Sequence, residues 1–180
     1  MRKDKIVQFV RFETKLDREP FIRQWELFNR SKDCDLDVNL QQYQKTDAFI
    51  YIAQHRCRSI EQPFAFTRAK KPSLTPEPEI KTKCAGGYSM LQAERINELH
   101  ANEIKVFAFL TNPRADLDRY RKLSSKAKLN IYEAYFENCV YAYILEFFIP
   151  NEFAPALQES LKQLGANETG MYTPCDLKAA

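Results

Sequence analysis

A histidine and a glutamate inside apolar segments are the side chains best suited to acid–base chemistry. His55 follows the apolar run 48–53 (AFIYIA), and imidazole titrates near neutral pH without a large perturbation. We therefore predict His55 as a general base or ligand-orienting group, with a hydrogen-bonded structural histidine as the alternative. Glu146 lies in the apolar run 140–148 (VYAYILEFF), where a buried carboxyl group must be paired or protonated. A raised pKa would suit Glu146 to proton transfer, so we predict it as the second catalytic residue.

Other polar and aromatic side chains on strand-like segments are candidates for a ligand site. Arg11 has mostly apolar neighbours, which makes it a natural partner for Glu146 or for an anionic ligand. An internal salt bridge, or an edge position facing water, is the alternative for these charges. We predict that the ligand-binding residues are Arg11, Tyr51, Tyr88, Glu133, Tyr135 and Phe148.

The sequence carries no pattern typical of a metal or phosphate site. Neither His55 nor His100 has a second histidine or a cysteine close by, so we predict no metal site. Four glycines in 180 residues argue against a glycine-rich phosphate-binding loop. No cofactor is therefore expected.

Hydrophobic periodicity predicts the elements that position these residues. The first half is predicted as strand, helix, strand and strand, then an ambiguous stretch over 59–68 and a last strand. Asp17 caps the helix, whose apolar face carries Phe21 and Trp25. The strands are expected at 6–12, 38–45, 48–53 and 84–91, with a proline-rich solvated loop at 69–83.

The second half repeats this plan more clearly. Its first helix begins at Asn112-Pro113, and its second follows Asn151 and ends at Gly165. The order strand, helix, strand, strand, helix, strand is that of a ferredoxin-like split βαβ unit. We therefore predict two halves, 1–95 with the loop 69–83, and 100–180. The strands of the second half are expected at 104–110, 130–136, 140–148 and 168–174.

Strand alternation predicts which side chains face the helices. On the third strand Tyr51 and His55 share one face, and Ile50 and Ile52 share the other. We expect the more apolar Ile50 and Ile52 to meet the helices, which would turn His55 away from them.

The stretch from Tyr132-Glu133 to Glu146 and Phe148 resembles the antibiotic-biosynthesis-monooxygenase-like group of the dimeric α/β-barrel superfamily. In that family a strand ending in Tyr-Glu leads by a hairpin to a strand ending in an acidic residue, an apolar residue and an aromatic residue. Glu146 and Phe148 occupy those last places, whereas the first half has Ala53 and His55 there.

This resemblance implies an α+β fold of two ferredoxin-like βαββαβ halves in one chain, with antiparallel sheets facing each other around a cavity. Members bind small aromatic or polyketide-like molecules or haem. Haem-degrading relatives use an axial histidine that is placed after a helix. The segment 56–66 downstream of His55 offers no convincing residue for that role, so no haem is expected.

Charge and cysteine content limit the partners and the compartment. Lys and Arg total 27 against 24 Asp and Glu, so the net charge of +3 favours neither nucleic acid nor a membrane surface as partner. No apolar run of about 18 residues predicts a spanning helix, and the N-terminus lacks the features of a signal peptide. Five cysteines without a CxxC pair favour reduced thiols and a cytoplasmic location.

Two functional hypotheses follow. The first is a cytoplasmic protein that binds a small apolar or aromatic molecule, with cofactor-free monooxygenation or isomerisation as the reaction if it is an enzyme. The alternative is a non-enzymatic structural or interaction protein that forms a homodimer through sheet or loop surfaces.

Overall fold

A computed structural model describes residues 6–30, 37–45, 47–57, 80–94 and 99–175. The chain divides into two compact units. Unit 1 comprises residues 1–87 and 174–180, and unit 2 comprises residues 88–173. Strand β4 (Ile80–Gln92) contributes to both units. The predicted domain ranges 1–95 and 100–180 stay a prediction.

Unit 1 contains one described helix and an antiparallel sheet in which β3 lies between β1 and β2. Asp17 stands at the N-cap position as predicted, because its backbone carbonyl accepts the first helical hydrogen bond, from the Phe21 amide at 3.1 Å. The predicted hairpin is confirmed, with Lys45 opposite Ala48. The ambiguous stretch 59–68 lies outside the described residues, as does the loop up to residue 79. The elements are β1 (Ile6–Thr14), α1 (Arg18–Arg30), β2 (Asp37–Lys45) and β3 (Ala48–Cys57).

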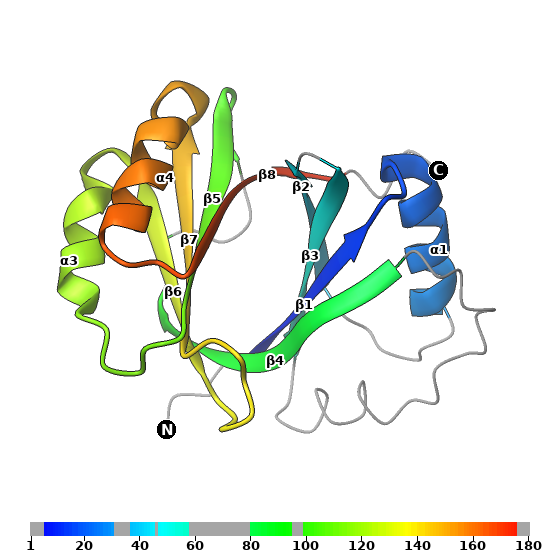
Figure 1. Ribbon diagram of the computed structural model, residues 1–180, viewed down its shortest axis with the longest axis horizontal. Coiled ribbons are helices and arrows are strands. Elements are labelled where there is room, and N and C mark those ends of the chain that lie inside the picture. The colour runs from blue at the N-terminus through cyan, green and yellow to red at the C-terminus, as the bar shows by residue number, and fades with distance from the viewer. Residues whose placement is uncertain (1–5, 31–36, 46, 58–79, 95–98, 176–180) are drawn as a thin grey trace. The chain divides into compact units, whose positions relative to one another are not determined.

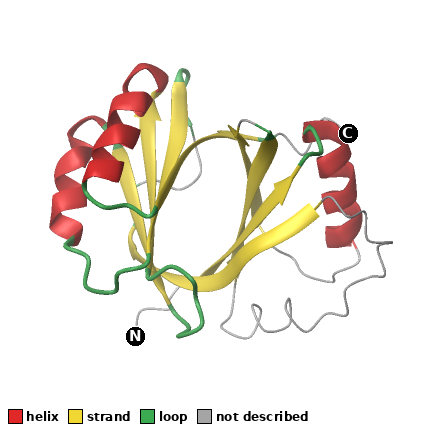
Figure 2. Ribbon diagram, in the orientation of Figure 1, coloured by secondary structure: helices red, strands yellow, loops and turns green. Residues whose placement is uncertain are grey.

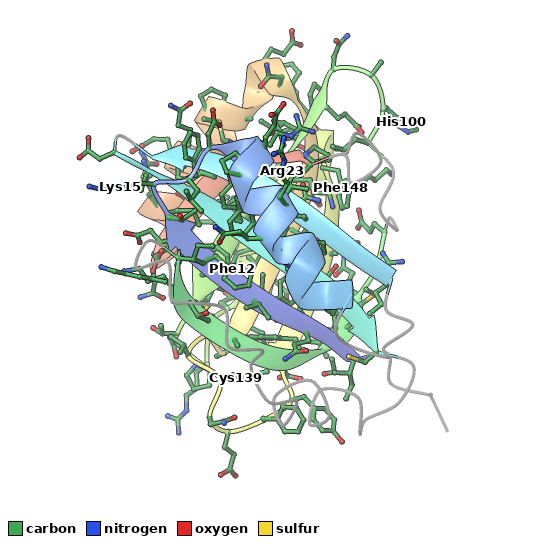
Figure 3. The ribbon with its side chains drawn as sticks, turned by 90° about the vertical axis from the view of Figure 1, so that its right-hand side faces the viewer. Phe12, Lys15, Arg23, His100, Cys139 and Phe148 are labelled. Carbon is green, nitrogen blue, oxygen red and sulfur yellow. The ribbon has the colours of Figure 1, made fainter. Side chains whose placement is uncertain are left out.

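Helix α1 covers the face of this sheet that carries Tyr51 and Ala53 (Figure 3). The Phe21 ring stacks on Tyr51 with centroids 3.7 Å apart, and the Tyr51 hydroxyl donates to the Leu16 carbonyl at 3.3 Å. The prediction that Ile50 and Ile52 meet the helix is therefore wrong. Both faces of β3 are apolar, and the stacked ring pair decides which one packs under α1.

Unit 2 confirms the predicted order strand, helix, strand, strand, helix, strand. Its antiparallel sheet has the strand order β8, β5, β7, β6, β4. The elements are β5 (Glu103–Leu110), α3 (Leu117–Arg121), β6 (Lys128–Ala134), β7 (Tyr143–Pro150), α4 (Ala154–Gln163) and β8 (Glu168–Pro174), with 3-10 turns η1 (Lys122–Lys126) and η2 (Asn151–Phe153).

Several element boundaries differ from the sequence-based expectation, and three examples show how. Helix α3 begins after Asp116, because the Asn112 side chain instead accepts a hydrogen bond from the Arg114 amide and forms a turn. The hairpin of β6 and β7 has a longer connection, in which Val140 is 56% exposed. Strand β4 begins at residue 80, so residues 80–83 belong to a strand and not to the loop.

Helices α3 and α4 cover one face of the unit 2 sheet (Figures 1 and 2). Leu157 and Leu161 of α4 are buried against this face, and Gly165 ends the helical stripe at φ +92°, as the sequence predicted. The predicted α+β class with antiparallel sheets is confirmed. Within the described residues, no helix has the length and apolar character needed to cross a membrane.

Each sheet has one face that its helices cover and one that they do not. We call the face away from α1 in unit 1, and the face away from α3 and α4 in unit 2, the far face of that unit.

Candidate functional site

Three neighbouring strands place polar side chains at one position on the far face of unit 2. Residues that are directly opposite in an antiparallel pair share a face. Phe107 of β5 and Asn130 of β6 both lie opposite Glu146 of β7, and Lys105 lies opposite Phe148. Alternation therefore puts these side chains on the far face, because Val106, Leu129 and Leu145 pack toward the helices. The far-face side chains of the three central strands are Lys105, Phe107, Phe109, Lys128, Asn130, Tyr132, Ile144, Glu146 and Phe148.

A buried ion pair is the centre of this group. The Lys105 Nζ atom lies 2.9 Å from Glu146 Oε1, and both side chains are only 1% exposed. The second carboxylate oxygen, Oε2, accepts hydrogen bonds from the Tyr132 hydroxyl at 2.7 Å and from Asn130 Nδ2 at 3.0 Å. The carboxylate is thus held by groups from β5 and β6 as well as by its own strand.

These contacts set the ionisation of Glu146. Burial raises the pKa of its carboxyl group, but the Lys105 ammonium and the hydrogen bonds from Lys105, Tyr132 and Asn130 outweigh burial. The net pKa lies below the ordinary value of 4.5, so Glu146 is ionised at neutral pH. This differs from the raised pKa that was expected from the sequence. The ionised Glu146 carboxylate therefore stabilises a neighbouring cation and does not readily accept a proton.

The Lys105 ammonium has capacity for a further partner. It lies 5.0 Å from the centroid of the Phe148 ring, which adds a cation–π contact to the ion pair. An ammonium group carries three donors. In the part of the chain that the structure describes, Nζ has no hydrogen-bond acceptor beyond the carboxylate beside it. An oxygen atom of a ligand would satisfy the remaining donors.

Aromatic rings extend the apolar part of the far face. Phe107 meets the edge of the Tyr172 ring at a centroid distance of 5.2 Å and lies 6.3 Å from Phe109. A Cβ atom at Gly170 would lie 2.7 Å from a carbon of the Tyr172 ring, so the glycine makes room for that ring. The rings and the ion pair together form an apolar surface with one pair of charged groups, and an apolar lining with a few polar groups is the usual composition of a small-molecule site.

His55 has a different environment, in unit 1. It shares the α1 side of β3 with Tyr51, is 1% exposed, and its ring lies 6.3 Å from that of Trp25. The expectation that His55 turns away from the helix is wrong, for the reason given for Tyr51. Its predicted role as a general base stays a prediction.

The remaining predicted ligand residues are divided among several environments. Tyr88 and Phe148 lie on the far face of unit 2, and both are buried. Glu133 lies opposite Tyr143 on the helix side and accepts a hydrogen bond from its hydroxyl at 3.3 Å. Burial, and secondarily Glu133, raises the pKa of Tyr143. Tyr135 is 41% exposed in the connection after β6.

Arg11 lies on the far face of unit 1, opposite Ile52. Its predicted pairing with Glu146 would join the two units and stays a prediction.

Sequence reasoning missed Lys105, Asn130 and Tyr132. One signal was present, because Lys105 is a charged residue inside the apolar run IKVFAFL and alternates in phase with Phe107 and Phe109. Its partner depends on the register of β5 against β7, which periodicity does not determine.

Comparisons with known proteins identify the fold. No protein-family model matches the sequence, and no curated protein matches it. A mutant chlorite dismutase from Candidatus Nitrospira defluvii is similar, with a TM-score of 0.58, 11% identity, and coverage of 98% of this chain and 94% of that one. A provisionally assigned monooxygenase of Fusobacterium nucleatum has a TM-score of 0.55, 11% identity, and coverage of 99% and 94%. An anthrone oxidase-like protein has a TM-score of 0.53, 10% identity, and coverage of 97% and 92%.

At these identities the likeness establishes the fold alone. The chain has the dimeric α/β-barrel fold that the sequence predicted.

Haem, which the family resemblance implies for some members, does not fit the described residues. His55 is packed against Trp25 on the α1 side of its sheet. His100 lies in an exposed segment before β5 (Figure 3). Neither imidazole stands on the far face of unit 2, and among the described residues no group of three or more His, Cys, Asp or Glu side chains suits a metal ion.

The ion pair predicts a strongly non-additive double-mutant cycle. Lys105→Met and Glu146→Leu should each lower the free energy of unfolding by about 3–5 kcal/mol, because each leaves one charge buried without its partner. The double variant should lose less than either single variant, because no buried charge remains. Urea unfolding measures all three, with Lys162→Met and Glu159→Leu as an exposed control pair whose coupling should stay below about 1 kcal/mol. Additive losses at Lys105 and Glu146 would contradict the geometry.

The lowered pKa of Glu146 predicts a stability loss in acid. A carboxyl group whose folded pKa lies below its unfolded value stabilises the folded state above the unfolded pKa, and this contribution disappears as pH falls through the folded pKa. The difference in unfolding free energy between the native protein and the Lys105→Met/Glu146→Leu variant should therefore change in acid, in favour of the variant, as pH falls below 4.5. Denaturant titrations at a series of pH values measure this difference. A constant difference across the acid range would show that the carboxylate is not preferentially ionised in the folded state.

The packing of His55 predicts a structural effect of its removal. His55→Ala should lower the free energy of unfolding by about 2 kcal/mol or more, because it leaves a cavity beside Trp25. His100→Ala is the control, with an expected change within about 0.5 kcal/mol, since this residue is exposed. Thermal and urea unfolding of both variants measure the effect. Native-like stability of His55→Ala would argue instead for the predicted functional role.

Proposed function

We propose that this chain is a cytoplasmic protein that binds a small apolar or aromatic molecule on the far face of unit 2 and acts on it as a cofactor-independent monooxygenase or isomerase. The observation that carries the proposal is the Lys105 ammonium, which is buried, held by Glu146 and left with donors for a further oxygen atom. Ligand sites are typically lined by apolar and aromatic side chains with a few polar or charged groups, and groups with perturbed pKa values cluster at such sites.

Lys105 gives this face a means of stabilising negative charge. A ketone with an acidic neighbouring C–H bond, or a phenol, becomes an oxygen anion when it loses a proton. A positioned ammonium in a water-poor site stabilises that anion more strongly than water does. Glu146 holds the Lys105 ammonium in place, and because its own pKa is lowered, the departing proton passes to a water molecule that enters with the substrate and not to Glu146.

The anion formed from such a ketone is an enolate, which carries part of its negative charge on carbon as a carbanion. The fate of this carbanion distinguishes the two reactions. In the isomerase reaction the proton returns to a different carbon, and no oxidant is needed. In the monooxygenase reaction molecular oxygen accepts the electrons of the carbanion. With an anthrone, the CH₂ group becomes C=O, one oxygen atom enters the product, and the other leaves as water with the two hydrogens. The likeness to a provisionally assigned monooxygenase and to an anthrone oxidase-like protein supports the second reaction.

A non-enzymatic interaction protein that forms a homodimer is the second candidate. Large apolar side chains of unit 2 are exposed at Leu91 (46%), Tyr135 (41%) and Val140 (56%). Exposed apolar side chains of this kind are typical of contact surfaces when they lie together. Native mass spectrometry of the purified protein distinguishes the candidates, because it reports both a co-purifying small molecule and the oligomeric state.

Oxygen consumption with anthrone as the probe tests the proposed reaction. The native protein should consume one oxygen molecule for each anthrone converted to anthraquinone. The Lys105→Met/Glu146→Leu variant, which carries no unpaired buried charge, should lose about 10²–10³-fold in rate, as expected when an oxyanion-stabilising donor is removed. Lys162→Met, at an exposed lysine, should retain the native rate.

Binding gives a second measurement that does not depend on turnover. Phe148→Leu should weaken anthrone binding without removing the ion pair, because it deletes the ring beside Lys105. Undiminished binding and turnover in the folded Lys105→Met/Glu146→Leu variant would refute the role of this face.

A further inference from the structure

The far face of unit 1 carries a polar row that the proposed function does not use. Arg11 of β1 lies opposite Ile52 of β3, and Ile52 lies opposite Gln41 of β2. The three residues therefore form a line across the sheet on one face. Gln54, two residues from Ile52, lies on the same face. Helix α1 packs on the other face, which carries Tyr51 and Ala53.

Gln41 is the residue of this row whose side-chain oxygen lacks a hydrogen-bond donor among the described residues. Its side chain is 1% exposed, and its Oε1 atom has no hydrogen-bond partner among the described residues. Buried carbonyl oxygens are nearly always hydrogen-bonded, because burial removes the water that would otherwise donate to them. A ligand that carries an O–H or N–H donor would satisfy Gln41.

Arg11 supplies the complementary group at the other end of the row. A guanidinium has five N–H donors, so it can serve a partner within the protein and the carboxylate of a ligand at the same time. Between Arg11 and Gln41 the face is apolar, with Ile52 at the centre and Ile50 and Phe9 beside it, all buried. An apolar floor with polar groups at its two ends is typical of sites for small organic molecules.

We propose that the far face of unit 1 binds a hydroxylated aromatic carboxylate. The carboxylate pairs with Arg11, the ring lies over Ile52, and the hydroxyl group donates to Gln41 Oε1. Because β3 lies between them, the backbones of β1 and β2 are about 10 Å apart, twice the strand spacing. A molecule the length of 4-hydroxybenzoate can therefore contact Arg11 at one end and Gln41 at the other. This site is independent of the proposed function, because it uses no residue of unit 2.

Calorimetric titration with 4-hydroxybenzoate and with benzoate tests this assignment. Gln41→Met should weaken the binding of 4-hydroxybenzoate by about 5–10-fold, the worth of one hydrogen bond, and leave the binding of benzoate unchanged. Arg11→Gln should weaken both compounds by about tenfold or more, because both carry the carboxylate. Gln44→Met, at an exposed glutamine of the same strand, is the matched control and should bind both compounds as the native protein does.

Three outcomes would overturn the proposal. The first is the absence of 4-hydroxybenzoate binding to the native protein at millimolar concentration. The second is an equal effect of Gln41→Met on both compounds. The third is loss of binding in the folded Lys105→Met/Glu146→Leu variant, which would place the compound in unit 2. If Arg11→Gln does not fold, the ratio of the two affinities in Gln41→Met still decides the question.

Discussion

The buried pair of Lys105 and Glu146 is the interaction on which the organisation of unit 2 depends. Two charges removed from water have a high desolvation cost, which is offset only when their geometry is fixed and the remaining polar atoms are satisfied. Here the three strands β5, β6 and β7 all contribute to that geometry, through Lys105, Asn130 and Tyr132, and Glu146 itself. A shift of one residue in the register of any of these strands would move its charged or amide group to the helix side, among the leucines. The pair therefore specifies strand register as well as local charge.

The two units both contain an antiparallel sheet with one or more helices on one face, but the side chains on their far faces differ in composition. In unit 2 the far face combines one ion pair with several aromatic rings, and one charge remains incompletely satisfied. In unit 1 it combines the buried apolar side chains of Phe9, Ile50 and Ile52 with the neutral amides of Gln41 and Gln54 and the guanidinium of Arg11. A face of the first kind favours an oxygen anion that forms during a reaction, whereas a face of the second kind favours a ligand whose polar groups are present from the start.

The sequence predicted the elements of unit 2 well because their periodic signals are strong. The apolar stripe of α4, its terminal glycine and the last strand over 168–174 were all placed correctly. The failures have specific physical causes. The Asn112 side chain accepts a hydrogen bond from a nearby backbone amide, and the helix begins only after Asp116. Strand β3 carries apolar residues on both faces, so alternation alone did not show which face meets α1. The orientation of His55 followed from that error. The partner of Glu146 was missed because it comes from a strand 41 positions earlier in the chain, and only the observed register brings Lys105 beside it.

The direction of the Glu146 pKa decides what kind of chemistry the far face of unit 2 can perform. A glutamate with a raised pKa would donate or accept the proton itself, and the site would act as a base. With the pKa lowered, the carboxylate stays ionised through the reaction and its work is electrostatic, because it fixes a cation in an environment of low dielectric constant. In the proposed reaction the acidity then comes from the substrate, whose C–H or O–H group becomes more acidic because Lys105 stabilises its conjugate base. The proposed site would therefore select molecules that are weak acids, and among aromatic compounds these are phenols and ketones that enolise readily.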